Sequence, residues 1–553
     1  MGQERKTVAQ LVVSCLEAEG VDYMFGIPGE ENIQLVDATA GSKVRFILTR
    51  HEQGAAFMAD IYGRLTGKAG VCTATLGPGA INLLLGVADA QTDSTPLVAI
   101  SAQVGLNRIY KESHQIIDLE AMFRPVTKWA STMLTPAAAP EMMRKAFDMA
   151  QSERPGAVYL AIPQDIEGAE VPADAVPLPS RPKHAAGPDP EQLALAVSLL
   201  RAAKSPIILA GHGVARAGAS DKLTELVDLL GIPVATTFMG KGVVSDRNPN
   251  ALGVVGFMRH DYENFAFDHA DVILAIGYEL QEFAPVRVNP HKDKKVIHIH
   301  CFAEDTDACY PISVAVEADI SRSLDALLGE FRRSPLNAAR MDAPIRALRD
   351  DELNSHADDD SYPLKPQRVI CDIRKAIADD DIVLVDTGAI KMWMARLYPA
   401  YSPLSCIISN GLSTMAFSLP GAIGAKLARP ERKVLAAMGD GSFMMNSQEI
   451  ETAVREKIPL KVLIWEDKAY GLIKWKMDLE LGHHRDVDFG NPDFVKYAES
   501  FGAKGYRIEQ AADLLPTLQK ALAEDGVSVI CCPVGYAENM KLTDRLGELT
   551  DPI

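Results

Sequence analysis

A strand–turn–helix–strand pattern at residues 433–467 constrains the fold of this chain more than any other segment. A β-rich run at 433–438 leads into the tripeptide Gly-Asp-Gly at 439–441, and an amphipathic helical stretch follows it. A second β-rich run at 460–465 ends shortly before Asp467. Such a crossover returns the chain parallel to its first strand, so the pattern predicts one unit of an α/β sheet.

The two strands of this unit would each bring one carboxylate to the same edge of the sheet. Asp440 and Asp467 are 27 residues apart, and neighbouring parallel strands lie about 4.8 Å from each other. Open α/β sheets bind ligands beyond the carboxyl ends of their strands. Two hard oxygen ligands there, beside glycines that let backbone N–H groups approach, suit Mg²⁺ bridging to a diphosphate. The structural alternative is a tight turn at the glycines with Asp467 as an N-cap.

Composition indicates a large globular protein. With 553 residues, 47% hydrophobic and 24% charged, the chain is long enough for about three domains. Its net charge of −18 argues against non-specific binding to nucleic acid or to an anionic membrane, although a local site can still bind a small anion. No apolar run is long enough to span a membrane, and the first residues, MGQERKTVAQ, lack an apolar signal core.

The eight cysteines are scattered, mostly inside apolar runs, and form no C-x-x-C pair. Cysteines in this pattern are typical of reduced core residues rather than of disulfides or a metal site. We therefore expect a cytoplasmic protein.

Two stretches divide the chain into three segments. The run at 171–190 is rich in Pro and Ala and is interpreted as a linker, and the polar run at 349–360 is interpreted as a second one. These linkers predict domains at 1–170, 190–340 and 362–553.

Each segment contains a short apolar strand that ends in a glycine turn, at 71–79, 206–213 and 433–441. The repetition predicts an α/β fold of three doubly wound domains with parallel sheets. Duplication is one origin of this likeness, and convergence is the other, because glycine often follows a buried strand.

Glu52 is placed in the first turn of a helix predicted at 50–67, after a β-rich run. A carboxylate at that position commonly interacts with the helix dipole. The functional alternative is a buried acid with a raised pKa, which exchanges protons near neutral pH.

Several motifs together resemble a known family. They are FGIPGEEN (25–32), RHEQGAAFMAD (50–60), GPGAIN (77–82), HQIIDLEAMFRPVTKW (114–129), SNGLSTM (409–415) and the Gly-Asp-Gly unit. In this order they resemble the acetolactate synthases of the thiamine diphosphate (ThDP)-dependent decarboxylase/carboligase superfamily, nearly from end to end. The resemblance implies a pyrimidine-binding, a central and a diphosphate-binding domain.

The resemblance also implies roles for individual residues. Glu52 would activate the cofactor by proton exchange, and Gln115 would face the substrate. Asp440, Asp467 and the backbone carbonyl of Ala469 would hold Mg²⁺. The residues that would contact ThDP are Ile27, Pro28, Gly29, Glu52, Thr75, Asn82, Asn410, Gly411, Met415, Gly439, Gly441, Ser442, Tyr470, Gly471, Leu472 and Ile473.

Two of these assignments have structural alternatives, and the turn at 77–79 has a separate interpretation. Met415 would wedge beneath the cofactor, but Met also commonly fills gaps in a core. Gln115 could instead be a loop amide satisfied by the backbone. The turn at 77–79 resembles a phosphate loop, yet the family places the diphosphate elsewhere, so we interpret it as a tight strand-to-helix turn, with Asn82 as the cofactor contact.

The sequence departs from the family pattern at a few positions. Glu466 precedes Asp467 where the family usually has Asn, and Ile390 stands where many acetolactate synthases have His, followed by Lys391. Trp475 is one position away from a tryptophan that biosynthetic enzymes use for substrate choice, so ordinary packing is its alternative. The segment 275–285 lacks the flavin-associated motif of biosynthetic enzymes, which predicts an enzyme without FAD.

The implied activity joins two pyruvate molecules into 2-acetolactate with loss of CO₂. The family builds its site between subunits, which implies a homodimer at least and predicts a homotetramer. Three alternatives stay open: a ThDP-dependent 2-oxo acid decarboxylase or carboligase with another acceptor, a flavin-bound pyruvate oxidase, and a catalytically silent paralogue.

Overall fold

The computed structural model describes residues 6–172, 174–180, 185–256, 263–336 and 344–540. By its internal contacts the chain divides into two compact units. The first comprises 1–183, 417–431 and 446–460, and the second comprises 184–416, 432–445 and 461–553.

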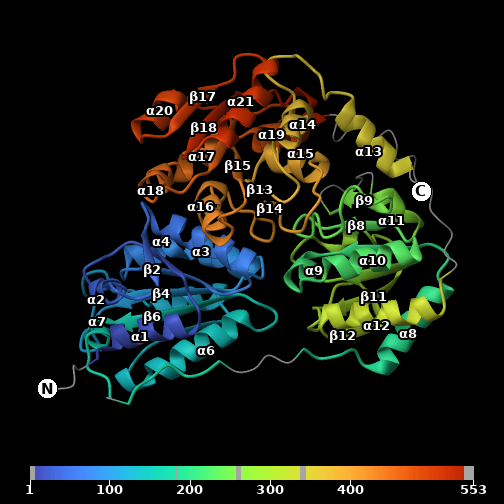
Figure 1. Cartoon of the computed structure of the whole chain (residues 1–553). Coiled ribbons are helices and arrows are strands. Elements are labelled where there is room, and N and C mark those ends of the chain that lie inside the picture. The colour runs from blue at the N-terminus through green and yellow to red at the C-terminus, as the bar shows by residue number, and fades with distance from the viewer. Residues whose placement is uncertain (1–5, 173, 181–184, 257–262, 337–343, 541–553) are drawn as a thin grey trace. The chain divides into compact units, whose positions relative to one another are not determined.

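The first unit is built on a six-stranded sheet with the order β2-β1-β3-β4-β6-β5, in which every pair is parallel (Figure 1). Its strands are β1 Tyr23–Gly26, β2 Arg45–Leu48, β3 Gly70–Ala74, β4 Leu97–Gln103, β5 Trp129–Thr132 and β6 Ala157–Pro163. Its helices are α1 Val8–Ala18, α2 Ile33–Ala38, α3 Glu52–Thr66, α4 Pro78–Thr92, α5 Leu119–Phe123, η1 Arg124–Val126, η2 Pro136–Ala138, α6 Ala139–Gln151, α7 Gln164–Glu167, α16 Ser418–Ala428 and α18 Glu449–Arg455.

Local sequence signals explain the first elements of this unit. Thr7 caps α1 and forms a reciprocal capping box with Gln10. Strands β4 and β6 are buried along their whole length, which suits strands of a parallel sheet covered on both faces. Helix α3 packs against α4 and α16 and buries every residue from Gly54 to Leu65.

The second unit contains two sheets, and the first of them has the order β12-β11-β10-β7-β8-β9, again all parallel. Its strands are β7 Pro206–Ala210, β8 Val234–Thr236, β9 Ala251–Val254, β10 Val272–Ile276, β11 Lys295–His300 and β12 Ile312–Glu317. The helices of this part are α8 Pro190–Ala202, α9 His212–Arg216, α10 Ser220–Leu230, α11 Asn264–His269, η3 Pro285–Arg287, α12 Ile320–Arg333 and α13 Pro344–Asn354. Numbered from β7, this order is 3-2-1-4-5-6, the order of dinucleotide-binding folds.

The other sheet of the second unit has the order β14-β13-β15-β16-β18-β17. Its strands are β13 Ile382–Val385, β14 Cys406–Ile408, β15 Val434–Gly439, β16 Lys461–Glu466, β17 Lys504–Arg507 and β18 Ser528–Pro533. The helices are α14 Pro366–Ala376, α15 Ala389–Leu397, α17 Asp440–Asn446, α19 Gly471–Leu481, α20 Phe494–Ser500, η4 Ala511–Asp513, α21 Leu514–Ala523 and η5 Ala537–Met540. Counted along the chain, its strand order is the same as that of the first unit's sheet, and the three parallel sheets confirm the predicted fold class.

One predicted linker is wrong in its first half. The polar run at 349–360 begins inside α13, which spans Pro344–Asn354. Its first residues contain no Gly or Pro to stop a helix, and Ile345 and Arg349 on the same helix are buried. Polarity alone therefore misled the assignment, because charged residues on the exposed side of a helix look like a linker.

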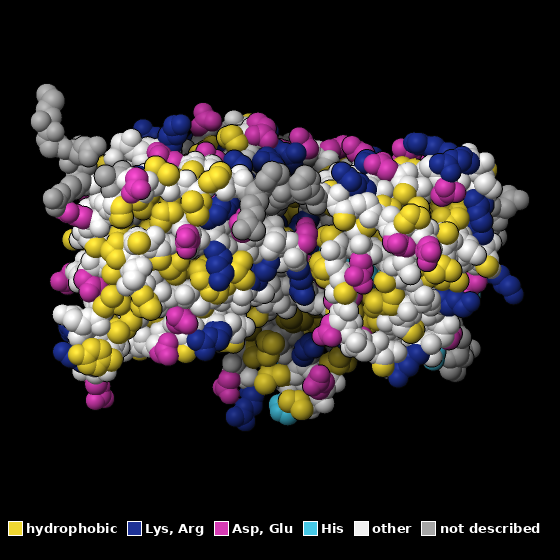
Figure 2. Space-filling model, turned by 90° about the horizontal axis from the view of Figure 1, so that it is seen from below, with side chains coloured by type: hydrophobic (Ala, Val, Ile, Leu, Met, Phe, Trp, Pro, Cys, Tyr) yellow, Lys and Arg dark blue, Asp and Glu magenta, His cyan; other side chains and the backbone are white. Residues whose placement is uncertain are grey.

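The described surface mixes both charge signs despite the net charge of −18. On the face shown in Figure 2, Lys and Arg side chains are interspersed with Asp and Glu. Among the described residues no helix is long and apolar enough to cross a bilayer. All eight cysteines are free, and seven of them are buried, as predicted; Cys301 is partly exposed.

A buried ion network in the first unit generates a stability prediction. The guanidinium of Arg64 lies 2.8 Å from Asp93 Oδ2 and 3.5 Å from Asp60 Oδ2, and all three side chains are almost fully buried. We expect Arg64→Met to lower the free energy of unfolding by about 3–5 kcal/mol, because it leaves buried carboxylates uncompensated. Urea unfolding of the variant and the wild type measures this loss of unfolding free energy. The exposed Arg124, paired with Glu120, is the matched control, and Arg124→Met should cost about 0–1 kcal/mol; equal losses would contradict the prediction.

Candidate active site

Asp440 and Asp467 lie at the carboxyl ends of two neighbouring strands, as their spacing predicts. Strands β15 and β16 pair in parallel, with Gly439 opposite Trp465. Asp440 begins α17 and accepts hydrogen bonds from the backbone N–H groups of Gly441 at 2.8 Å and Lys468 at 2.7 Å. The two loops that follow the strands therefore fix this carboxylate.

The electrostatics of this pair favour a bound cation. Burial and the charge of Asp440 raise the pKa of Asp467 to about 7, and burial also raises the pKa of Asp440. Two buried carboxylates that repel each other are relieved by a divalent cation, so the donor set fits Mg²⁺. Within the described residues no group of three or more His, Cys, Asp or Glu could hold a metal, so further ligands would have to come from backbone or diphosphate oxygens.

Asn491 is a member of this site that the sequence did not reveal. Its Nδ2 donates to Asp440 Oδ2 at 2.8 Å and to Glu466 Oε1 at 3.3 Å. Glu466 also accepts from Arg507 at 3.0 Å, so it holds the surrounding loop rather than joining the Asp pair. Asn491 follows Asp440 by 51 residues, and no local motif marks it.

A cavity opens beside the two aspartates; we call it the Asp440 cavity. The predicted residues that line it are Met415, Gly439, Asp440, Gly441, Ser442, Asp467, Ala469, Tyr470, Gly471, Leu472 and Ile473. Residues that the sequence did not single out for the site also line it: Thr387, Gly388, Ala389 and Tyr536, together with Ile390. Most of the predicted residues of the third segment thus meet around one space.

The loop that carries Met415 is held by Asp386, another residue missed from the sequence. The Asp386 carboxylate is fully buried and accepts from the Ser442 hydroxyl at 2.8 Å and from the Ala416 N–H at 3.0 Å. Lys391 holds the same loop at its other side, donating to Ser409 O at 3.1 Å and Ser413 Oγ at 2.8 Å. Met415 is thereby fixed against the cavity.

Asn410 and Gly411 are not among the residues that line the Asp440 cavity. The Asn410 amide instead donates to the backbone carbonyl of Glu282. Trp475 is buried within the surrounding core and lines an adjacent cavity with Lys474 and Asp478. Its packing agrees with the structural alternative given above.

In the first unit, Glu52 begins α3, as predicted. His51 caps the helix, with its Nδ1 accepting from the Gln53 N–H at 3.1 Å. Asn82, from α4, donates to Glu52 Oε2 at 3.0 Å. The Glu52 side chain is partly exposed in this unit.

Several other predicted residues of the first segment lie beside the turn that faces Glu52. A Cβ added to Gly79 would lie 3.3 Å from Glu52 Oε1 and 2.9 Å from Thr75, and one added to Gly29 would collide with Thr75. Gly77 has φ +54°, which only glycine adopts without strain, and precedes α4 as the predicted strand-to-helix turn. Gln115 lies against this turn, because a Cβ added to Gly77 would come within 3.4 Å of its backbone and Cβ atoms.

Glu449 supports the start of α3, and the sequence did not indicate this role. Its carboxylate is fully buried and accepts from the backbone N–H groups of Arg50 at 3.1 Å and His51 at 3.0 Å, and from Thr452 at 2.6 Å. Gly54 allows the close approach, since a Cβ there would lie 2.7 Å from Glu449 Oε1. The two residues before Glu52 are thus held by one buried acid.

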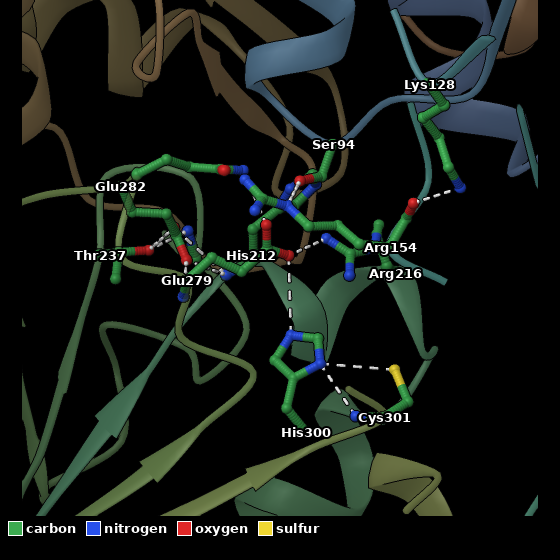
Figure 3. Close-up of polar contacts among 12 residues, drawn as sticks. Ser94, Lys128, Arg154, His212, Arg216, Thr237, Glu279, Glu282, His300 and Cys301 are labelled. Atoms are coloured by element: carbon green, nitrogen blue, oxygen red, sulfur yellow. Dashed lines mark hydrogen bonds and ion pairs between the residues drawn. The ribbon is translucent and has the colours of Figure 1, made fainter. Parts of the chain in front are cut away.

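The glycine turn after β7 contains a carboxylate where a nucleotide-binding fold would hold a phosphate. Glu282 accepts from the His212 N–H at 3.1 Å and from the Thr237 hydroxyl, and burial raises its pKa to about 8 (Figure 3). Glu279 lies beside it, paired with Arg216 and 3.6 Å from His300. A Cβ on Gly211 would meet Glu282 Oε1 at 2.6 Å, so the turn is filled by the chain's own side chains.

Three family models match the chain. The thiamine pyrophosphate enzyme N-terminal TPP binding domain matches residues 6–122, the central domain matches 193–327, and the C-terminal TPP binding domain matches 386–532. Apart from Tyr536, the residues that line the Asp440 cavity lie within the C-terminal match, and Glu52 lies within the N-terminal one.

Several curated proteins are similar over nearly the whole chain. A probable acetolactate synthase large subunit of Methanococcus aeolicus is 36% identical, covering 99% of this chain and 95% of that protein. Acetolactate synthase of Bacillus subtilis (strain 168) is 34% identical over 98% and 96%, and the catabolic acetolactate synthase of Raoultella terrigena is 34% identical over 97% and 97%.

Glu449 generates a prediction for the pH dependence of stability. Burial raises its pKa from 4.5 to about 7, so the folded chain binds this proton more tightly than the unfolded chain does. Its contribution is complete below pH 4.5 and is lost as the pH rises through 7. Relative to Glu449→Gln, we therefore expect the wild type to lose on the order of 1–3 kcal/mol of unfolding free energy over this interval. Urea unfolding of both proteins across the interval measures this difference, and a pH-independent difference would contradict the prediction.

Proposed function

Because the chain belongs to the thiamine pyrophosphate enzyme family, we propose that it is an acetolactate synthase. It would convert two pyruvate molecules into 2-acetolactate and CO₂. The observation that carries this proposal is the end-to-end similarity to proteins named acetolactate synthase. The acidic pair at the Asp440 cavity supports it, since a diphosphate cofactor needs a cation there.

The residues of the Asp440 cavity fit the metal and the diphosphate. We propose that Asp440, Asp467 and the Ala469 carbonyl hold Mg²⁺, and that Gly439, Gly441 and Ser442 approach the diphosphate. Bound ThDP supplies an electron sink that accepts the electrons released when CO₂ leaves the substrate. The apolar side chains of Met415, Leu472 and Ile473 would keep water from the reacting carbon.

Glu52 is proposed to hold and exchange the proton that activates the cofactor. Its hydrogen bond from Asn82 at 3.0 Å orients one carboxylate oxygen and leaves the other for a proton. Asn82 would therefore act through Glu52 as a positioning residue, in addition to its proposed cofactor contact. Ile27, Pro28, Gly29 and Thr75 are proposed to form the wall around the cofactor's pyrimidine, and Gln115 to face the substrate.

We also propose that the enzyme works without FAD. The support is the carboxylate of Glu282, which accepts the His212 N–H and the Thr237 hydroxyl at the glycine turn of the 3-2-1-4-5-6 sheet. A carboxyl group in that position fills the space of a nucleotide's phosphate and takes up its hydrogen-bond donors. A purified protein that shows flavin absorbance would contradict the proposal that the enzyme works without FAD.

The remaining proposals concern organisation. Domain bounds at 1–170, 190–340 and 362–553 agree in order with the three family matches. A homodimer is the proposed minimum and a homotetramer the proposed assembly, because the family builds its site between subunits. The free cysteines support the cytoplasm as the proposed location.

The activity is tested with purified protein, pyruvate, ThDP and Mg²⁺, with product analysis. We expect 2-acetolactate and CO₂ in equal amounts, and no product without ThDP. Acetaldehyde without acetolactate would instead identify a decarboxylase, and product formed only with an added aldehyde would identify a carboligase with another acceptor. A parallel reaction with 2-ketobutyrate measures acceptor preference.

Glu52→Gln tests the proton-exchange role. The amide keeps the size of the side chain but removes its acidic proton, so we expect kcat to fall by at least about 100-fold, as removal of a general acid–base does. Steady-state kinetics measure the change. Glu141→Gln, on the exposed side of α6, is the control and should keep the wild-type rate. Unchanged turnover in Glu52→Gln would refute this role.

A mixing experiment tests whether the site is shared between chains. Glu52→Gln and Asp467→Asn are each expected to be inactive, while heterodimers with Glu52 and Asp467 intact in different chains should regain one working site. We therefore expect activity to reappear after the two variants are dissociated and reassociated together. No recovery, although mass measurements show mixed dimers, would mean that both residues act within one chain.

A further inference from the structure

A second polar cavity lies in the second unit, apart from the Asp440 cavity; we call it the cationic cavity. It has a volume of about 220 Å³ and is lined by residues that follow β8, by residues of α13 and by the end of α15. Five of its lining side chains are Lys or Arg and two are Asp. This excess of positive charge is opposite to the sign of the whole chain, whose net charge is −18.

Three of the five cations are held in place by neighbouring groups. Arg349 lies 3.3 Å from Asp246 and 3.0 Å from Asp350, and it also donates to the Leu252 carbonyl. Burial alone would lower the pKa of Arg349, but the carboxylates of Asp246 and Glu263 raise it. Arg247 forms a two-point ion pair with Asp379, and Arg346 donates to the Asn248 carbonyl. These side chains form a preorganised wall.

Lys241 differs from them because its charge is poorly compensated. Its side chain is 2% exposed, and its ammonium lies 3.7 Å from Asp246 Oδ2, which is too far for a hydrogen bond. Within the described residues this is its only ion pair, and no hydrogen bond accompanies it. Both oxygens of Asp246 are already engaged, one by Arg349 and the other by the Ala400 N–H at 2.8 Å. An ammonium that borders a cavity in this state, on an otherwise buried side chain, favours an additional anion.

We propose that the cationic cavity binds a small phosphate-class dianion through Lys241, with Arg346, Arg349 and Arg396 around it. Free phosphate fits better than a nucleotide, because the ring of Tyr401 is already covered by Arg247 at 3.6 Å and Arg374 at 4.9 Å. A nucleobase would therefore have to compete with these two guanidinium groups for the ring of Tyr401.

The position of the site connects it to the rest of the second unit. Helix α15 begins with Ala389 and Ile390, which line the Asp440 cavity, and ends with Arg396 and Leu397, which line the cationic cavity. The two cavities therefore lie at opposite ends of one helix, and an anion paired with Arg396 would contact its last turn.

The test measures the melting midpoint of the holoenzyme, with ThDP and Mg²⁺ saturating so that added phosphate does not occupy the cofactor's own site. In about 10 mM phosphate we expect a midpoint about 2–4 °C higher than in chloride of equal ionic strength. Lys241→Met should remove this rise, and its midpoint in chloride should equal or exceed that of the wild type, because an under-compensated buried charge is gone. Arg333→Met, an exposed cation of α12, should keep the wild-type rise.

The outcomes separate the alternatives. No rise in the wild type, or the same rise in Lys241→Met, would overturn the proposal. A lower midpoint of Lys241→Met in chloride, without a phosphate response in the wild type, would make Lys241 a structural ion-pair residue and would also overturn it. A larger rise with ADP than with phosphate would support the anion site and assign it to a nucleotide. None of these outcomes depends on turnover, so they remain distinct from a failure of the proposed synthase activity.

Discussion

The repulsion between two buried carboxylates on neighbouring strands is the constraint around which the proposed site is arranged. Strands β15 and β16 must pair for their sheet to form, and their pairing places Asp440 and Asp467 at one edge. Burial and the nearby charge of Asp440 raise the pKa of Asp467 to about 7. The folded chain therefore contains an electrostatic repulsion that a divalent cation relieves. The other contacts of the site, from Asn491, Lys468 and Gly441, hold Asp440 in that arrangement.

The strand order of the sheet that carries Asp440 is repeated in one of the other two sheets. The first unit's sheet and the sheet that carries Asp440 have the same order of strands, and the glycine turn follows the third strand in each. In the first unit that turn opens α4, which carries Asn82 toward Glu52. The sheet of β7 to β12 has a different order, and its glycine turn holds Glu282. Shared topology therefore favours duplication for two of the three sheets and not for the third.

Much of this could be predicted from the sequence because the informative signals are local. The glycine turns, the apolar strands and the spacing of Asp440 and Asp467 each lie within one crossover unit. Asn491, Asp386 and Glu449 were missed because each acts on residues far along the chain, without a motif. The sequence predicts a linker over the second half of α13 because the polar residues of this helix hide its buried face. Lys241 is informative only once its distance from Asp246 is known.

Calorimetric titration of ThDP into the purified protein, with and without Mg²⁺, tests the central claim most directly. The account predicts tight binding that requires Mg²⁺ and weakens by at least about 100-fold in Asp467→Asn, because the metal loses one of its anionic ligands. Glu466→Gln, the neighbouring carboxylate that pairs with Arg507, should retain Mg²⁺-dependent binding. Equal affinity in Asp467→Asn and wild type, or binding that ignores Mg²⁺, would contradict the account.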